Sequence, residues 1–180
     1  MADKNKLEQA ARLILEAIGE DPNREGLLET PRRFAEMMEE QMAYTTVSNE
    51  EIARQFGKTF TSSEEGPVVV KDISIFSHCE HHLALMYHMH VSVGYIPHGR
   101  VIGLSKVARI ADAVSRRLQI QERIGADIRN IIEKVTVRID GEHSCMAARG
   151  IKKPGAVTTT ISSSGKFNTP EYRQLFKDML

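Results

Sequence analysis

Two short segments of the chain bring together the side-chain types that bind transition metals. Residues 79–82 (CEHH) place a cysteine and a histidine three positions apart, and residues 143–145 (HSC) place another histidine beside the second cysteine. Thiolate sulfur and imidazole nitrogen are ligands well suited to zinc. Because both cysteines of the chain stand beside histidines, the two segments predict one shared zinc site rather than a disulfide.

The number of ligands decides what such a zinc ion does. Three protein ligands leave a position for water, whose pKa zinc lowers to about 7, whereas four protein ligands make a closed structural site. We take Cys79, His82 and Cys145 as the ligands. His81 and His143 then remain free to carry protons in a hydrolysis. If His143 is instead a fourth ligand, the site is structural, and spacing alone leaves both interpretations open.

A cluster of cations opens a predicted helix. Residues 103–109 (GLSKVAR) place Lys106 and Arg109 three positions apart, on one helical face. A cation in the first turn opposes the helix dipole, and the free N–H groups of that turn favour an anion such as phosphate. The alternative is a solvated basic face. A further basic run, residues 149–153, follows Cys145 and is expected near the metal.

A polar run at residues 119–123 (QIQER) offers one more recognition group. The Glu122 carboxylate can accept hydrogen bonds from two adjacent N–H donors, as the edge of guanine presents them. Such a run is ordinarily a solvated helix face. The spacing alone is therefore only weak support for a binding site at residues 119–123.

The first 60 residues are expected to form a helical segment. Apolar residues recur at helical spacing from Leu7 to Ile18, and Gly19 is a plausible end. Thr30 is predicted to cap a second helix with proline at its first position. Ser48 with Glu51 forms the pattern of a capping box that opens a third helix.

Residues 61–180 are expected to form one catalytic unit with the metal site. The predicted elements do not alternate strictly in type: two strands (67–76 and 85–96) are followed by two helices (105–117 and 119–134), two more strands (135–145 and 156–162) and a short helix at the end of the chain. This order predicts an α+β fold, in which a four-stranded, mostly antiparallel sheet carries two helices on one face. Unpaired sheet edges and an uncovered face favour oligomerisation.

Alternation along the third predicted strand points at the metal site. Val135, Val137 and Ile139 share one face, which continues through His143 to Cys145 if the strand runs on.

Bulk properties exclude several classes of protein. The 180 residues contain 24 basic and 24 acidic side chains. The chain therefore lacks the overall positive charge that would indicate nucleic-acid binding. No stretch approaches the roughly 20 apolar residues of a membrane helix, and the polar N-terminus lacks an apolar signal core. We therefore expect a cytoplasmic protein without a membrane partner.

Taken together, the motifs resemble the GTP cyclohydrolase I family over nearly the whole chain. Many pieces in the right order make this resemblance specific, although no single piece does. The matching pieces are ETPRR (29–33), CEHH (79–82), YIP (95–97), VIGLSK (101–106), QIQER (119–123), HSC (143–145), RG (149–150) and KPG (153–155).

The resemblance implies a tunnelling fold whose sheets join into an oligomeric barrel, with two pentameric rings stacked as a homodecamer. It implies Zn²⁺ on Cys79, His82 and Cys145, and GTP as the substrate, in active sites made between subunits. The substrate-binding residues that it implies are Glu122 for the guanine edge, assisted by Gln121 and the backbone near Ile102; Ser105 near the ribose or phosphates; and Lys106, Arg109, Arg149 and, from a neighbouring subunit, Arg33 for the triphosphate.

The implied reaction is hydrolysis at C8 of guanine, release of formate, and rearrangement to 7,8-dihydroneopterin triphosphate, the first step of tetrahydrofolate and pterin biosynthesis. His143 would protonate the ring nitrogen and His81 would assist proton transfers. Two alternatives stand beside this one: a non-catalytic oligomeric zinc module closed by His143, and a sister enzyme of the same fold acting on a pterin or a deazapurine.

Two departures from the family pattern stand out. The stretch between Arg123 and His143 is several residues shorter than expected, and we place the loss in the loop near Lys134. The segment after His82 (LALMYHMH) lacks the Pro-Phe pair common in the family. Its histidines 88 and 90 are interpreted as barrel-lining or solvated side chains, and His78 as a weaker ligand candidate than Cys79.

Overall fold

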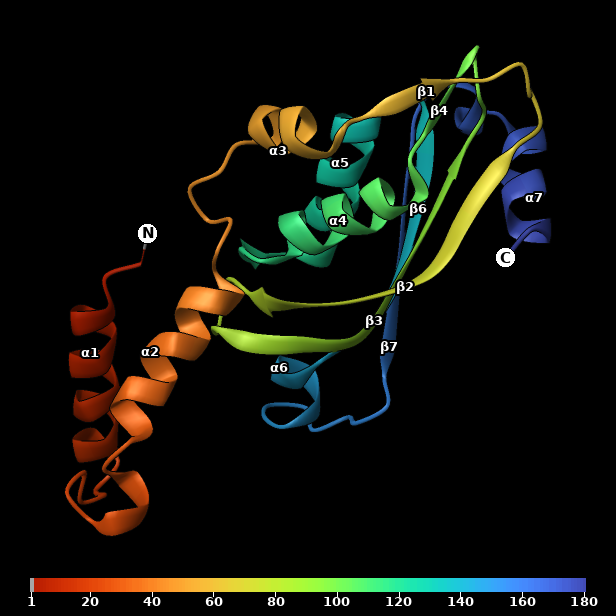
Figure 1. Cartoon of the computed structure of the whole chain (residues 1–180). Coiled ribbons are helices and arrows are strands. Elements are labelled where there is room, and N and C mark those ends of the chain that lie inside the picture. Colours follow the sequence, from red (N-terminus) through yellow and green to blue (C-terminus); the bar gives the residue numbers. More distant parts are fainter. Residues whose placement is uncertain (1) are drawn as a thin grey trace. The chain divides into compact units, whose positions relative to one another are not determined.

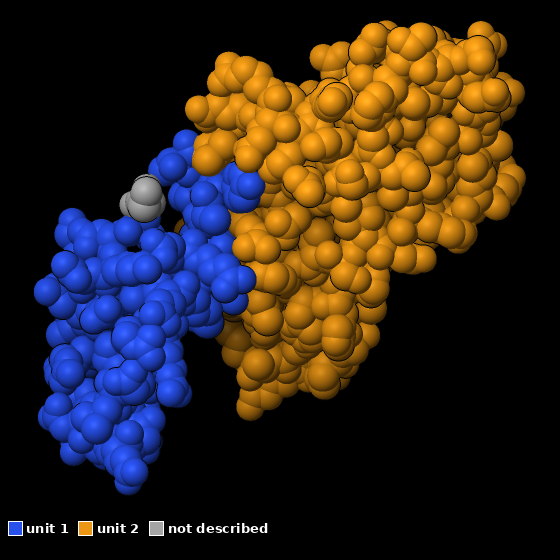
Figure 2. Space-filling view, viewed as in Figure 1, with its two compact units in different colours: residues 1–46 blue, residues 47–180 orange. Residues whose placement is uncertain are grey.

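The computed structural model describes residues 2–180, which divide into two compact units, one ending at residue 46 and the other covering residues 47–180 (Figure 2). This division lies before helix α3 (Asn49–Phe56), whereas the sequence analysis placed its boundary after that helix, at residue 60. Helix α3 packs against helices of the second unit, because Ile52 and Phe56 are buried on its inner side.

The first unit is a pair of helices. Helix α1 (Lys4–Ala17) and helix α2 (Thr30–Gln41) pack along each other, with the short 3-10 helix η1 (Glu25–Leu27) between them. Gly19 follows the end of α1 with a φ of 87°, which confirms it as the stop, since glycine adopts this left-handed conformation without strain. The cap of α2 is Glu29 rather than Thr30, one position earlier than predicted.

The second unit is built on β-sheet. Within residues 2–180, five strands form one sheet in the order β5-β2-β3-β6-β7, and two short strands, β1 and β4, form another. All pairs are antiparallel except β5 with β2. The strands are β1 (Thr59–Thr61), β2 (Val68–Cys79), β3 (Ala84–Tyr95), β4 (Arg100–Ile102), β5 (Leu118–Gln119), β6 (Val135–His143) and β7 (Val157–Ser163).

Helices cover the sheet unequally (Figure 1). Helix α4 (Leu104–Ser115) contacts β2, and helix α5 (Gln121–Ile132) contacts β6 and β7, so the two predicted helices lie on one face. Val137 and Ile139, which alternation assigned to that face, are fully buried. The 3-10 helix η2 (Gly165–Asn168) and helix α7 (Pro170–Asp178) follow β7.

Part of the opposite face is covered by α7. The ring of Phe176 lies against Gly94 of β3, where an added Cβ would stand 2.7 Å from the ring atom Cδ2. The sheet face that the sequence analysis left uncovered is therefore occupied at this position, and glycine is required there by close approach rather than by backbone conformation.

Three predictions about elements are wrong in detail. The sheet has five strands rather than four, because β5 has two residues and is too short to show a periodicity. Strand β6 ends at His143, and Cys145 lies in the short helix α6 (Ser144–Ala147), so alternation does not position that cysteine. Helix α4 begins at Leu104, with Gly103 as its N-cap, and so starts one residue before the predicted 105.

Candidate metal centre and surrounding site

Cys79, His82 and Cys145 come together at one end of the sheet. One ligand atom from each residue lies within 4.8 Å of the other two, which makes them a candidate metal group. Cys79 is buried, Cys145 is half-buried and His82 is exposed, so the group is open on the histidine side. Two sulfur donors and one imidazole are a donor set that suits zinc.

The first two ligands lie in the hairpin that joins β2 to β3. Cys79 is the last residue of β2, where it pairs with Ala84, and the backbone N–H of His82 donates to the carbonyl of Cys79 at 3.3 Å. Cys79 and His82 therefore come together across the tight turn of this hairpin.

This turn is tied to the start of α5. The backbone N–H of Glu80 donates to the carbonyl of Gln119 at 3.0 Å, and the Glu80 carboxylate accepts two hydrogen bonds from Arg123, at 2.6 and 3.0 Å. Paired contacts of this kind fix orientation as well as distance. The Arg123 hydrogen bonds lower the pKa of the Glu80 carboxyl, so the pair is charged.

Cys145 reaches the turn from α6. The Ser144 hydroxyl donates to the carbonyl of Leu85 at 2.7 Å and fastens α6 to β3. Burial, and then the nearby Cys79 thiol, raise the pKa of the Cys145 thiol. A bound cation would reverse this shift, since it stabilises the thiolate.

His143 is held by a buried glutamine. Its Nε2 lies 2.9 Å from Oε1 of Gln121, the first residue of α5, which is 1% exposed. Burial lowers the pKa of His143, and the Glu122 carboxylate opposes this shift. Among residues 2–180, the candidate metal group contains no fourth member, so His143 is not part of it.

His81 and Arg149 flank the cluster. Nδ1 of His81 lies 3.6 Å from Sγ of Cys79, and the guanidinium of Arg149 donates to Nε2 of His82. Both side chains belong to exposed residues. The predicted proton carrier and one predicted phosphate ligand thus lie beside the metal group.

The loop that carries Arg149 is fastened by Glu142. The Glu142 carboxylate accepts from the backbone N–H of Gly155 at 3.2 Å and lies 3.0 Å from Nδ1 of His88. His88 has a positive φ of 46° beside an irregularity in the β3–β6 pairing, so regular strand alternation is interrupted at this residue. This role of Glu142 was not predicted from the sequence, although its place on the polar face of β6 was a signal for it.

The predicted anion cluster stands at the start of α4. Ser105 and Arg109 are exposed and Lys106 is half-buried. Within the described residues, the side chains of Lys106 and Arg109 have no hydrogen-bond partner. Glu122 is exposed in the first turn of α5, and its effect on the His143 pKa places its charge near that ring.

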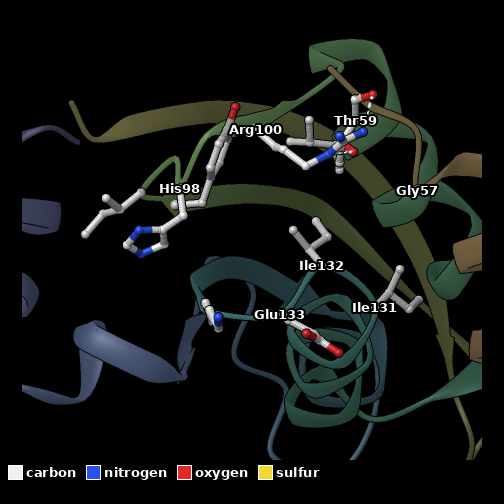
Figure 3. A pocket seen from close by; sticks show the side chains of 11 residues that line it. Gly57, Thr59, His98, Arg100, Ile131, Ile132 and Glu133 are labelled. Atoms are coloured by element: carbon white, nitrogen blue, oxygen red, sulfur yellow. Dashed lines mark hydrogen bonds between the residues drawn. The ribbon is translucent and has the colours of Figure 1, made fainter. Parts of the chain in front are cut away.

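The other two predicted residues lie on elements that contribute no member to the candidate metal group. Arg33 is an exposed residue of α2, in the first unit. Ile102, at the end of β4, is buried and lines the pocket in Figure 3, where the side chain of Arg100 reaches Thr59 with a hydrogen bond of 2.7 Å. This pocket contains none of the three candidate ligands.

The remaining features singled out by the sequence have structural places. His78 is buried, which lowers its pKa, and its Nδ1 has no hydrogen-bond partner among the described residues. The segment expected to be short is a connection of two residues between α5 and β6, Glu133 and Lys134, both with positive φ. Across residues 2–180, no helix is both long and apolar enough to cross a membrane.

Comparison with known proteins gives a consistent result. The family model for GTP cyclohydrolase I matches residues 7–180. The chain is 57% identical to GTP cyclohydrolase 1 of Clostridium acetobutylicum, with 94% of this chain and 92% of that protein covered. It is 55% identical to the protein of the same name from Clostridium beijerinckii and 53% identical to one from Clostridium botulinum, each with 93% of this chain and 91% of the relative covered.

Proposed function

Because the chain belongs to the GTP cyclohydrolase I family, we propose that it hydrolyses GTP at C8 of guanine, releases formate and forms 7,8-dihydroneopterin triphosphate. The observation that carries this proposal is the convergence of Cys79, His82 and Cys145 within 4.8 Å, with His143 nearby but outside the group. We further propose that the product enters tetrahydrofolate synthesis in the cytoplasm.

Zinc fits the donor set, and Cys79, His82 and Cys145 would hold it. When bound, zinc lowers the pKa of a coordinated water to about 7 and so supplies hydroxide at neutral pH. A ligand group of three supports this catalytic arrangement over a closed structural site, which would need His143 as its fourth member.

His143 and His81 would move the protons. The lowered pKa of His143 keeps its ring largely neutral at pH 7, so it can take up a proton and pass it to the guanine ring nitrogen as the C8–N bond breaks. His81 lies against Cys79 and is exposed, and it would exchange protons between the reacting groups and water.

The substrate would lie along the exposed polar groups around the cluster. Glu122 would accept from the guanine edge, with backbone groups near Ile102 assisting, and Ser105, Lys106, Arg109 and Arg149 would hold the ribose and triphosphate. The side chain of Gln121 is buried and its amide is already hydrogen-bonded, so any contact with the purine would come from its backbone. Arg33 would join from a neighbouring subunit.

Assembly into a barrel of subunits, and then a homodecamer, is part of the proposal. Strand β7 stands at an edge of the sheet within the described residues, and its Val157 and Ile161 are 59% and 54% exposed. An edge strand with exposed apolar side chains is stabilised by pairing with another strand.

The test is one assay in which GTP turnover and zinc content are measured on the same sample. We expect about one zinc per subunit, formate, and a pterin that becomes fluorescent after oxidation. A zinc-loaded oligomer that yields neither product would refute the proposed activity and leave the structural zinc module. Turnover of a pterin or deazapurine without turnover of GTP would instead support the sister enzyme.

A further inference from the structure

Gln121 has a hydrogen-bond pattern that fixes which way its side chain points. Its Nε2 lies 3.0 Å from the carbonyl oxygen of Ile139, 2.9 Å from that of Thr158 and 3.3 Å from the hydroxyl of Thr160. The carbonyl oxygens can only accept, so they require the NH₂ end of the amide. A flipped amide would set oxygen against two carbonyl oxygens inside a buried site, which is costly.

The fixed amide leaves Oε1 as the atom that faces His143. This oxygen can only accept a hydrogen bond, and it lies 2.9 Å from Nε2 of the ring. Nε2 must therefore carry the hydrogen. In the neutral ring the other nitrogen, Nδ1, then has the free lone pair.

We propose that Gln121 is a positioning residue, which holds His143 as the Nε2–H tautomer and leaves Nδ1 as the atom that takes up and returns the catalytic proton. The proposal rests on the proposed function for the role of His143, but it assigns Gln121 to this ring rather than to the substrate. A proton that arrives at Nδ1 gives an imidazolium with both nitrogens protonated, and its return from the same atom restores the starting tautomer.

The surrounding packing supports this assignment. Gly141 of β6 leaves the space that the amide occupies, since an added Cβ would stand 3.2 Å from Oε1 of Gln121 and 2.9 Å from Cγ of Met89. Strands β6 and β7 both supply acceptors to Nε2, so the amide is anchored to the sheet on one side and to the ring on the other. A side chain with this anchoring has little freedom to follow a substrate.

Gln119 provides a matched control. It is also a glutamine that is 1% exposed, and its Nε2 donates to the carbonyl of Val114 and the carboxylate of Asp127, both at 3.0 Å. It has no hydrogen bond to His143 among the described residues. Gln119→Met and Gln121→Met thus each remove one buried amide, but only the second removes the acceptor for Nε2.

The experiment combines NMR with steady-state kinetics on the zinc-loaded oligomer. With ¹⁵N-labelled histidine at about pH 8, above the ordinary histidine pKa of about 6.5, the wild-type protein should show an exchange-protected Nε2–H signal. The absence of this signal from His143→Asn would assign it to His143.

Gln121→Met should lose this protection and lower kcat about 10- to 100-fold, part of the 10²–10⁴-fold typical of acid–base catalysis. The KM for GTP should stay within about twofold, since the side chain does not touch substrate.

Gln119→Met and Thr160→Val should keep the protected signal and lose less than about threefold in kcat. A protected Nε2–H that survives in Gln121→Met, or a variant whose KM rises while kcat is unchanged, would overturn the positioning role. A wild-type protein that shows the protected signal but does not turn over GTP would overturn the proposed function and not the hydrogen bond, so the two failures are distinguishable.

Discussion

The metal cluster and the basic start of α4 would supply the two halves of the proposed reaction, and they are built differently. Around the cluster, Cys79 is buried and the turn that follows it is held by the paired contacts between Glu80 and Arg123. On α4, Arg109 is exposed, and Lys106 has no side-chain hydrogen bond within the described residues.

Under the proposed function, this chain by itself orders the metal half of the site, whereas the anion-binding half would be completed by its ligand. Chemistry at a metal needs ligands and proton carriers fixed in advance, and here backbone and buried side-chain hydrogen bonds supply that order. Binding of a triphosphate would need charge that remains free for the ligand, and the side chains of Lys106 and Arg109 have no hydrogen-bond partner within the described residues.

The largest effect is expected at the candidate metal group, the half of the site whose side chains are held by the most hydrogen bonds. Cys145→Ser should abolish zinc binding and GTP turnover together, because a serine hydroxyl is a poor zinc ligand at neutral pH. Zinc per subunit, measured by atomic emission on the purified oligomer, and formate release check this. Lys106→Ala is the matched control and should keep its zinc. A zinc-replete Cys145→Ser protein would remove Cys145 from the ligand set.

His143→Ala should separate catalysis from metal binding. Because His143 lies outside the metal group, the variant should keep its zinc while kcat falls by about 10²–10⁴-fold, the typical contribution of a general acid or base. Single-turnover kinetics with zinc quantified in the same sample measure both. Loss of zinc with the histidine would instead support the closed structural site.

The sequence predicts the parts of this arrangement whose residues are close together along the chain, and misses those whose residues are far apart. The three candidate ligands and the basic turn could be predicted because each motif is local, and the spacing of its residues is visible along the chain. The route by which Cys145 reaches the cluster was predicted wrongly, because alternation continues a strand through residue 145 and gives no sign of the short helix α6.

The hydrogen bond between Gln121 and His143, on which the proposed positioning role rests, could not be predicted from spacing. Two partners of Gln121, namely His143 and Thr158, are 22 and 37 positions away, so the pairing depends on the packing of α5 against β6 and β7. The two-residue strand β5 is invisible for the same reason, since only its pairing with β2 defines it. Contacts made across the sheet, rather than along the chain, are the part that local patterns do not contain.

An intermediate effect is expected at the basic turn. Lys106→Ala and Arg109→Ala should each raise the KM for GTP by about 10- to 160-fold, because each removes a charge-assisted contact worth about 1.5–3 kcal/mol, while zinc content stays at the wild-type level. Activity titrations against GTP at low and high salt measure this, and the difference from wild type should shrink as salt screens the charges.

Lys177→Ala is the control for these variants. Lys177 is an exposed lysine of α7, which packs on the opposite face of the sheet, so its loss should leave the KM unchanged. Equal effects from Lys177 and Lys106 would mean that overall charge, and not a local anion site, attracts the substrate.

The smallest effect is expected from a variant that tests how tightly the side chains around Gln121 are packed. Gly141→Ala should lower the free energy of unfolding by about 1–3 kcal/mol, because the added methyl would meet Met89 at 2.9 Å and push against Gln121 in a buried site.

The control is Gly125→Ala, in the interior of α5, which should raise the free energy of unfolding. Its added Cβ would stand at an ordinary 3.4 Å from Ser162, and alanine stabilises a helix by roughly 0.5–1 kcal/mol relative to glycine. Chemical denaturation of both variants at one protein concentration gives the comparison. If Gly141→Ala left the free energy of unfolding unchanged and the protected Nε2–H of His143 persisted, the sheet would have moved to accommodate the methyl. The side chains around Gln121 would then be packed less rigidly than proposed.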